Sequence, residues 1–88
     1  MKLVFSDEAW KDYQHWIKIN PKIKDRVNEL IKQCQRTPFN GVGKPEPLRG
    51  DLSGWWSRRI TQEDRIVYRV AGTGDAQSLE IAQLRFHY

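Results

Sequence analysis

The sequence ends on an imidazole and a phenol, in the segment Arg85-Phe86-His87-Tyr88. An unperturbed imidazole has a pKa of about 6.5, so a histidine can hold and release a proton near neutral pH. The last residues of a chain usually fray, and we therefore expect a strand through "LEIAQLRFHY" to hold these side chains in place. A lone histidine is more often structural than catalytic, and from this residue alone both interpretations stay open.

A carboxylate and a guanidinium could complete a reactive set with His87. Glu46 stands between two prolines in "KPEPL", and because proline fixes φ, the carboxylate is presented on a stiff, extended segment. Arg65, in "EDRIVY", carries a permanent charge that matches phosphate oxygens. Glu46 with the nearby Arg49 is also compatible with an ordinary salt bridge.

The three groups would match cleavage of RNA without a metal ion, in which the 2′-hydroxyl attacks the adjacent phosphate. That reaction needs a base, a cation that stabilises charge on the phosphorane, and an acid that protonates the leaving 5′-oxygen. Glu46 suits the base, Arg65 the cation and His87 the acid. Glu46 and His87 are far apart in the sequence, so spacing alone does not bring them together.

Strands in the second half of the chain must position these residues. The segments "WWSRRI", "DRIVYRV" and "SLEIAQLRF" predict an antiparallel meander. Alternation along the last two strands predicts an apolar core face: Ile66, Tyr68, Val70, Ala82, Leu84 and Phe86. It predicts an opposite, basic face: Arg65, Val67, Arg69, Ile81, Gln83, Arg85 and His87.

The basic face has two interpretations. It is suited to bind single-stranded nucleic acid if an aromatic ring lies beside the arginines, because phosphates pair with Arg and bases stack on rings. It is equally compatible with simple solvation of an outer sheet face. Trp55 and Trp56 are adjacent and must face opposite ways, and the sequence does not decide which of them is available for stacking.

The first half of the chain predicts a strand and two helices. "KLVF" is strand-like, and Ser6 can cap a helix that carries Trp10, Tyr13 and Ile17 at helical spacing. Asn20 and Pro21 are typical of the start of a second helix. Its apolar stripe consists of Ile23, Val27, Leu30, Ile31 and Cys34.

A single α+β domain over residues 1–88 follows from these elements. We expect a strand, two helices, a long irregular loop "TPFNGVGKPEPLRGDLSG" and an antiparallel sheet of three further strands. Because long loops in compact domains are often functional, the loop that carries Glu46 is a candidate site region.

Composition narrows the class of partner. The net charge is +4 and the sequence pI is about 9.5, which favours a polyanionic partner such as RNA or DNA, although such a charge also keeps a small domain soluble. One cysteine, Cys34, excludes an intramolecular disulfide, and with two histidines no Cys/His metal cluster is expected. No apolar run approaches the length of a membrane span. We therefore expect a cytoplasmic protein with no metal, no cofactor and no membrane partner.

The stretches "RTPFNGVGKPEPLRGDLSGWWSRRIT" and "EDRIVY", with the terminal "HY", resemble YoeB-type toxins (the Txe/YoeB family) of bacterial type II toxin-antitoxin modules, within the RelE-like superfamily. The resemblance runs nearly end to end. It implies a small RelE-like fold of the microbial-ribonuclease type. It also implies an mRNA interferase, a ribosome-dependent endoribonuclease that inhibits translation by cutting translated mRNA in the A site of the 70S ribosome without a metal ion. Implied partners are mRNA, the ribosome, a YefM-like antitoxin and a second copy of the chain in a homodimer.

The resemblance also assigns roles to single residues. It implies that Glu46 is the general base, Arg65 the phosphate-stabilising arginine and His87 the general acid, and that Tyr88 positions the RNA. Three further cations are expected to bind RNA phosphates: Lys44, Arg49 and Arg59. Arg49 stands where relatives often have lysine, so we expect it to bind phosphate and not to act in catalysis.

Two other classes of protein remain as alternatives. One is a non-enzymatic ParE-like toxin that binds DNA gyrase, and the other is a plain nucleic-acid-binding module. Glu46 and His87 favour the nuclease, because neither alternative needs a carboxylate and an imidazole near a phosphate.

Overall fold

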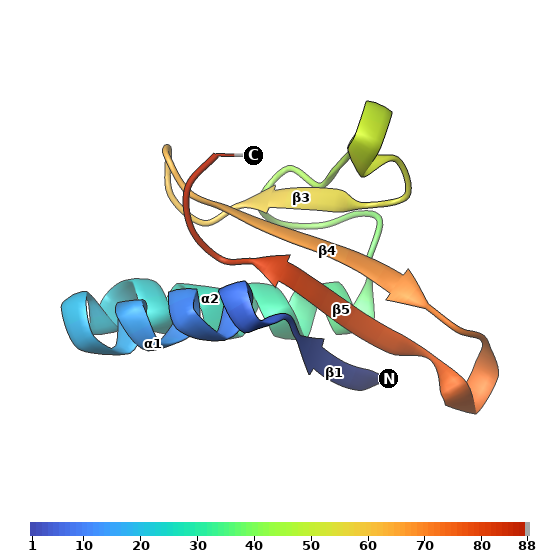
Figure 1. Cartoon of the computed structure of the whole chain (residues 1–88), viewed down its shortest axis with the longest axis horizontal. Helices are drawn as coiled ribbons and strands as arrows, with labels where there is room; N and C mark the ends of the chain where they lie inside the picture. Colours follow the sequence, from blue (N-terminus) through green and yellow to red (C-terminus); the bar gives the residue numbers. More distant parts are fainter. Residues whose placement is uncertain (88) are drawn as a thin grey trace.

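In the computed structural model, which describes residues 1–87, two helices lie against one face of a five-stranded mixed sheet (Figure 1). The α+β class predicted from the sequence is confirmed. The helices are α1 (Asp7–Ile19) and α2 (Pro21–Arg36), and the strands are β1 (Lys2–Phe5), β2 (Glu46–Pro47), β3 (Trp56–Arg59), β4 (Arg65–Ala71) and β5 (Ser78–Gln83). Neither of these helices is long and apolar enough to cross a membrane.

The strand order is β1-β5-β4-β3-β2, with β1 parallel to β5 and the other pairs antiparallel. The predicted meander of β3, β4 and β5 is confirmed. The expectation of three strands after the helices is wrong by one, because Glu46 and Pro47 pair with Ser57 and Trp56 and add β2 at the sheet edge. The prolines that keep "PEP" extended also confine it to an edge, where a missing N–H is tolerated.

Both helices begin where their capping residues predict. The Ser6 hydroxyl accepts a hydrogen bond from Ala9 N at 3.0 Å, and Asn20 Oδ1 accepts one from Ile23 N at 3.4 Å, with Pro21 in the first turn. These bonds satisfy main-chain donors that a helix leaves without intrahelical partners.

The buried face was predicted for α2 but not for α1. In α2, Val27, Leu30, Ile31 and Cys34 are buried as expected. In α1, Trp10 and Ile17 are exposed, and the buried residues are Ala9, Asp12 and Trp16. Polar contacts of Asp12 and Trp16 with the segment after β5 account for this orientation, and apolar spacing alone could not show them.

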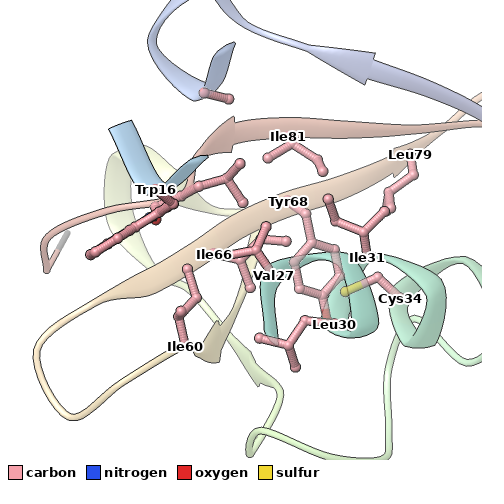
Figure 2. Close-up of a cluster of buried hydrophobic side chains, with 12 residues drawn as sticks. Trp16, Val27, Leu30, Ile31, Cys34, Ile60, Ile66, Tyr68, Leu79 and Ile81 are labelled. Atoms are coloured by element: carbon pink, nitrogen blue, oxygen red, sulfur yellow. The ribbon is translucent and has the colours of Figure 1, made fainter. Parts of the chain in front are cut away.

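The hydrophobic core lies between the helices and the sheet (Figure 2). Tyr68 of β4 is fully buried and its ring lies among side chains of α2. The remaining core comes mainly from β4, β5 and the two helices: Trp16, Val27, Leu30, Ile31, Cys34, Ile60, Ile66, Leu79, Ile81 and Leu84.

A β-bulge changes the predicted faces of the last strand. Tyr68 pairs with Ile81 and Val67 pairs with Gln83, so Ala82 is an extra residue. Ile81 therefore faces the core, and its predicted place on the basic face is wrong. Leu84 is buried as predicted, because the bulge shifts the alternation by one residue.

The strand also ends earlier than predicted. β5 stops at Gln83, and Phe86 is 57% exposed with a φ of 64°. Its predicted place in the core is therefore wrong. The segment after β5 turns back past the β3–β4 connection instead of continuing as a strand (Figure 1).

Candidate active site

Five of the seven predicted site residues line one pocket of about 200 Å³. Lys44, Glu46, Arg59, Arg65 and His87 surround it together with Ser57. Arg49 is not among the lining residues, and Tyr88 lies outside the described residues. The lining residues thus come from the loop before β2, from the strands β2, β3 and β4, and from the segment after β5.

Register between β2 and β3 positions Glu46. Glu46 is directly opposite Ser57 in the antiparallel pair, and the hydrogen bond from Leu48 N to Trp55 O, 2.8 Å, extends the pairing beyond β2. Ser57 is only 3% exposed and forms part of the pocket wall. Sequence reasoning missed Ser57, although its alternation with Arg59 in "WWSRRI" places both on one face.

A buried arginine holds the loop that leads to Glu46. Arg58 is fully buried, and its guanidinium donates to three main-chain carbonyl oxygens of the loop and to one hydroxyl. The acceptors are Val42 O at 3.1 Å, Asn40 O at 2.9 Å, Thr37 O and Tyr68 Oη at 3.1 Å. The Tyr68 hydroxyl in turn donates to Pro38 O at 2.6 Å. These bonds fix residues 37–42 against β3 and β4.

Gly43 and Lys44 connect this loop to the pocket. Gly43 has a φ of 86°, and a Cβ there would lie 3.1 Å from Leu30 Cδ2 and 3.2 Å from Arg58 Cβ. Its carbonyl accepts a hydrogen bond from Arg59 N at 2.8 Å. Lys44 follows with a φ of 53°, which residues other than glycine rarely adopt. The position of Lys44 is therefore set by a tight turn that only a glycine before it permits.

Arg65 is anchored to the β3–β4 turn. Its Nη1 donates to the carbonyl oxygens of Thr61 at 2.9 Å, Gln62 at 3.1 Å and Asp64 at 3.0 Å. These three bonds restrict the half-buried guanidinium beside the pocket. A cation held in this way needs little reorganisation when negative charge develops next to it.

Helix α1 anchors the start of the segment that carries His87. Asp12 Oδ2 accepts a hydrogen bond from Leu84 N at 3.0 Å, and Trp16 Nε1 donates to Leu84 O at 2.8 Å. Burial raises the pKa of the Asp12 carboxyl, while the hydrogen bond from Leu84 N–H acts in the opposite direction.

The β3–β4 turn anchors the same segment nearer to His87. Asp64 Oδ1 accepts from Phe86 N at 2.8 Å, and Arg65 N donates to Phe86 O at 3.0 Å. Phe86 adopts the left-handed conformation between these two bonds. The imidazole therefore reaches the pocket from a segment fixed at both Leu84 and Phe86.

The charges around the pocket suit an anion. Among the lining residues within positions 1–87, Lys44, Arg59 and Arg65 outnumber the one carboxylate, Glu46. Within residues 1–87 no group of three or more His, Cys, Asp or Glu side chains is arranged to hold a metal ion. The one cysteine, Cys34, is buried in the core, and burial raises its pKa to about 11. The pocket thus brings a carboxylate and an imidazole together among cations, a set of groups that can act on a phosphodiester.

The overall fold is that of RelE-type toxins. The toxin-antitoxin complex RelBE2 from Mycobacterium tuberculosis has a TM-score of 0.69 at 24% identity, covering 98% of this chain and 96% of that chain, and this likeness concerns the fold alone. The family model described as "YoeB-like toxin of bacterial type II toxin-antitoxin system" matches residues 5–88. The chain belongs to this YoeB-like family and is a toxin of a type II toxin-antitoxin system, as the sequence motifs predicted.

Close relatives extend over the full chain. Toxin YoeB of Escherichia coli strain K12 is 56% identical over 88 residues, the whole of both chains. A structure of a YoeB/ParE toxin from Agrobacterium tumefaciens has a TM-score of 0.97 at 53% identity and full coverage of both chains. A YoeB dimer and a YoeB-YefM complex from Staphylococcus aureus each have a TM-score of 0.86, at 37% and 38% identity, covering 100% of this chain and 98% of each of those chains.

Proposed function

We propose that this toxin is an mRNA interferase, a ribosome-dependent endoribonuclease that cuts translated mRNA in the A site and so inhibits translation. The observation that carries the proposal is the convergence of Glu46, Arg65 and His87 on one small pocket lined by further cations. A gyrase-binding toxin would have no need for an acid-base pair in such a pocket.

The proposed reaction is a transesterification within the RNA strand. Glu46 removes the proton of the 2′-hydroxyl, whose oxygen then bonds to the adjacent phosphorus. Arg65 stabilises the extra negative charge on the phosphorane, and His87 gives its proton to the 5′-oxygen as the P–O5′ bond breaks. The products are a 2′,3′-cyclic phosphate and a 5′-hydroxyl. DNA is not cut because it lacks the nucleophile.

Other residues hold the substrate. Lys44 and Arg59 line the pocket and bind phosphate oxygens beside the cleaved bond. Arg49 is exposed outside the pocket and contacts phosphates further along the strand. Tyr88 is proposed to position the RNA. No metal ion is needed, because the arginines and the lysine supply the positive charge.

The proposed dependence on the ribosome is supported by the small number of described groups that line the pocket, because they offer no obvious base-specific contact and leave much of the positioning of the RNA to the ribosome. A volume of about 200 Å³ has room for a phosphodiester group. We therefore propose that the 70S ribosome presents the message to the pocket. We further propose a homodimer and inhibition by a YefM-like antitoxin, supported by the similarity to the Staphylococcus aureus dimer and complex. A cytoplasmic location is also proposed, because translated mRNA is the proposed substrate.

Primer extension on a translated message tests the proposal. Purified protein is added with and without 70S ribosomes, and three variants are compared: His87→Ala, Glu46→Gln and His15→Ala. His15 lies on α1 outside the pocket and serves as the matched histidine control. We expect ribosome-dependent cuts that fall by roughly 10²- to 10⁴-fold in His87→Ala and Glu46→Gln and persist in His15→Ala.

A message with a 2′-deoxy nucleotide at the cut position tests the nucleophile, and it should resist cleavage there. If the folded wild-type protein makes no ribosome-dependent cuts, the nuclease proposal is wrong. Inhibition of DNA gyrase by the same preparation would then support the ParE-like alternative.

A further inference from the structure

A tryptophan and an arginine stack on the outer face of the sheet, next to the pocket. The guanidinium carbon of Arg69 lies 4.5 Å from the centroid of the Trp55 ring. The β3–β4 register pairs Arg59 with Arg65 and Ser57 with Val67, and its continuation brings Trp55 opposite Arg69. Since side chains alternate along a strand, the Trp55–Arg69 pair belongs to the same face as the pocket, one row beyond Ser57.

The structure also decides between the two adjacent tryptophans. Trp56 packs against the hydrophobic core, and the centroid of its ring lies 4.9 Å from the centroid of the Phe39 ring. Trp55 is on the opposite side of the strand, away from the core. Of the two rings that the sequence left open, Trp55 is therefore the one that faces the side of the pocket.

An ion pair holds the arginine on the ring. Arg69 Nε lies 2.5 Å from Glu80 Oε1, and the two residues are opposite each other in the β4–β5 register. The Arg69 side chain is still 46% exposed. Ring and carboxylate together fix the plane of the guanidinium while leaving much of its surface open to solvent.

The cluster of Trp55, Arg69 and Glu80 contributes little to the stability of the fold. An exposed cation–π pair and an exposed ion pair each add little to the free energy of unfolding. The pocket itself has no Trp, Tyr or Phe among its lining residues in the described part of the chain. The described lining residues therefore offer no aromatic ring to the bases of an RNA strand whose phosphate occupies the pocket.

We propose that Trp55 and Arg69 form a stacking site for an unpaired RNA base near the phosphate held in the pocket. Unstacked bases bind on aromatic rings and on guanidinium planes, and both are present here in one fixed cluster. The inference rests on the proposed nuclease function. It gives RNA a second contact with the protein, in addition to the phosphate in the pocket. The base belongs either to the message or to ribosomal RNA at the A site, and both share the same chemistry.

Two assays with matched variants test the site. The first measures the dependence of cleavage on toxin concentration with programmed ribosomes. The second measures binding of a single-stranded 2′-O-methyl RNA oligonucleotide, which cannot be cut, in the absence of ribosomes. The variants are Trp55→Ala, Trp55→Phe and Arg69→Ala, with Trp10→Ala as the control for an exposed tryptophan outside the pocket.

We expect Trp55→Ala to raise the half-saturating concentration by roughly 5- to 100-fold, the range of a lost base–aromatic stack. The maximal rate of cleavage should stay close to that of the wild type, because the ring does not touch the reacting atoms. Trp55→Phe keeps a ring and should recover most of the affinity, and Trp10→Ala should match the wild type. Circular dichroism checks the fold, and Arg69→Ala provides a solvent-exposed substitution if Trp55→Ala does not fold.

The outcomes distinguish the two possible sources of the stacked base, and they distinguish failure of the stacking site from failure of the nuclease proposal. Weaker binding in both assays assigns the base to the message, and weaker binding on ribosomes alone assigns it to ribosomal RNA. If Trp55→Ala and Arg69→Ala behave like Trp10→Ala in both assays, the stacking site is wrong. If the folded wild-type protein makes no ribosome-dependent cuts, the nuclease proposal fails instead, and the oligonucleotide assay continues to test the stacking site.

Discussion

Asp64 binds the main chain of Phe86: its Oδ1 accepts a hydrogen bond from Phe86 N at 2.8 Å, while its Oδ2 accepts one from Thr61 Oγ1 at 2.8 Å. The next residue, Arg65, donates its own N–H to Phe86 O at 3.0 Å. Two consecutive residues thus hold the peptide groups that precede His87. The turn that fixes the proposed phosphate-stabilising arginine also fixes the proposed proton donor.

Asp64→Ala should therefore slow cleavage without removing a reacting group. A hydrogen bond to a charged group contributes about 1.5–3 kcal/mol, so partial release of His87 is expected to lower the single-turnover rate by roughly 10- to 100-fold. Asp64→Asn retains an oxygen that accepts from Phe86 N–H and should recover much of the rate. Single-turnover cleavage on programmed ribosomes measures both variants.

Glu63→Ala is the matched control for Asp64, because this neighbouring carboxylate is exposed and outside the pocket. A positioning role changes the rate of cleavage while the concentration dependence stays that of the wild type. Equal rates for Asp64→Ala and Glu63→Ala would show that the hydrogen bond to Phe86 does not position His87.

Asp12 should make stability depend on pH. It is 4% exposed, and burial raises its pKa above the ordinary value of 3.8. The folded protein then binds more protons than the unfolded chain between the two pKa values. The contribution of Asp12 to stability is fully present below the unfolded pKa and is lost as pH rises through the folded pKa.

Asp12→Asn removes this titration but keeps an oxygen that accepts from Leu84 N–H. The free energy of unfolding of the wild type, relative to Asp12→Asn, should decrease as the pH is raised from about 4 to about 7. Urea denaturation at a series of pH values measures the difference. Asp7→Asn, at an exposed position in the first turn of α1, is the control. Parallel pH profiles for the wild type and Asp12→Asn would contradict the expectation.

Cys34 should be unreactive in the folded protein. It is fully buried, and burial raises its pKa to about 11, so at pH 8 it is a thiol with no access to solvent. A disulfide reagent that releases a coloured thiolate measures this reactivity at pH 8. It should react with Cys34 of the native protein no faster than the protein unfolds, and it should react rapidly in urea. Fast reaction of the native protein would show that α2 opens locally around Cys34.

Local sequence signals predicted the helices and the meander, but not the details that shape the site. Ser6 and Asn20 cap the helices through side chains next to them in the sequence, so both boundaries could be predicted. The two residues of β2 are too few to show any alternation. The bulge at Ala82 is visible in the spacing of apolar residues in the sequence. The buried residues Leu79, Ile81 and Leu84 are separated by two positions and then by three, which a regular strand would not show.

The candidate site depended on different information. Glu46, Arg65 and His87 were chosen for the chemistry of their side chains and then matched to family motifs, and neither charge nor spacing could show that they share a pocket. Their convergence depends on pairing between β2 and β3 and on the bond between Asp64 and Phe86, which join residues distant in the sequence. Arg58 could not be predicted, because alternation places it on the core face and its partners are mostly main-chain carbonyls.

Arg58 provides the last prediction. Replacing it with methionine leaves the carbonyl oxygens of Asn40 and Val42 and the Tyr68 hydroxyl without their donor. A buried polar group left without a partner costs about 1–3 kcal/mol. Some of the carbonyls will bind water once the loop loosens, so Arg58→Met should lower the free energy of unfolding by about 2–4 kcal/mol. Urea denaturation measures this change.

Arg69→Met is the matched control, since Arg69 also lies on a central strand but is exposed, and its loss should change stability by less than about 1 kcal/mol. Arg58→Lys keeps the charge but cannot reach four acceptors with one ammonium group, so it should stay well below the wild type in stability. If loosening of residues 37–42 reaches Lys44 and Glu46, Arg58→Lys should also cut more slowly under conditions where it is fully folded. Equal denaturation midpoints for Arg58→Met and Arg69→Met would mean that the loop is held by its own backbone and not by the buried guanidinium.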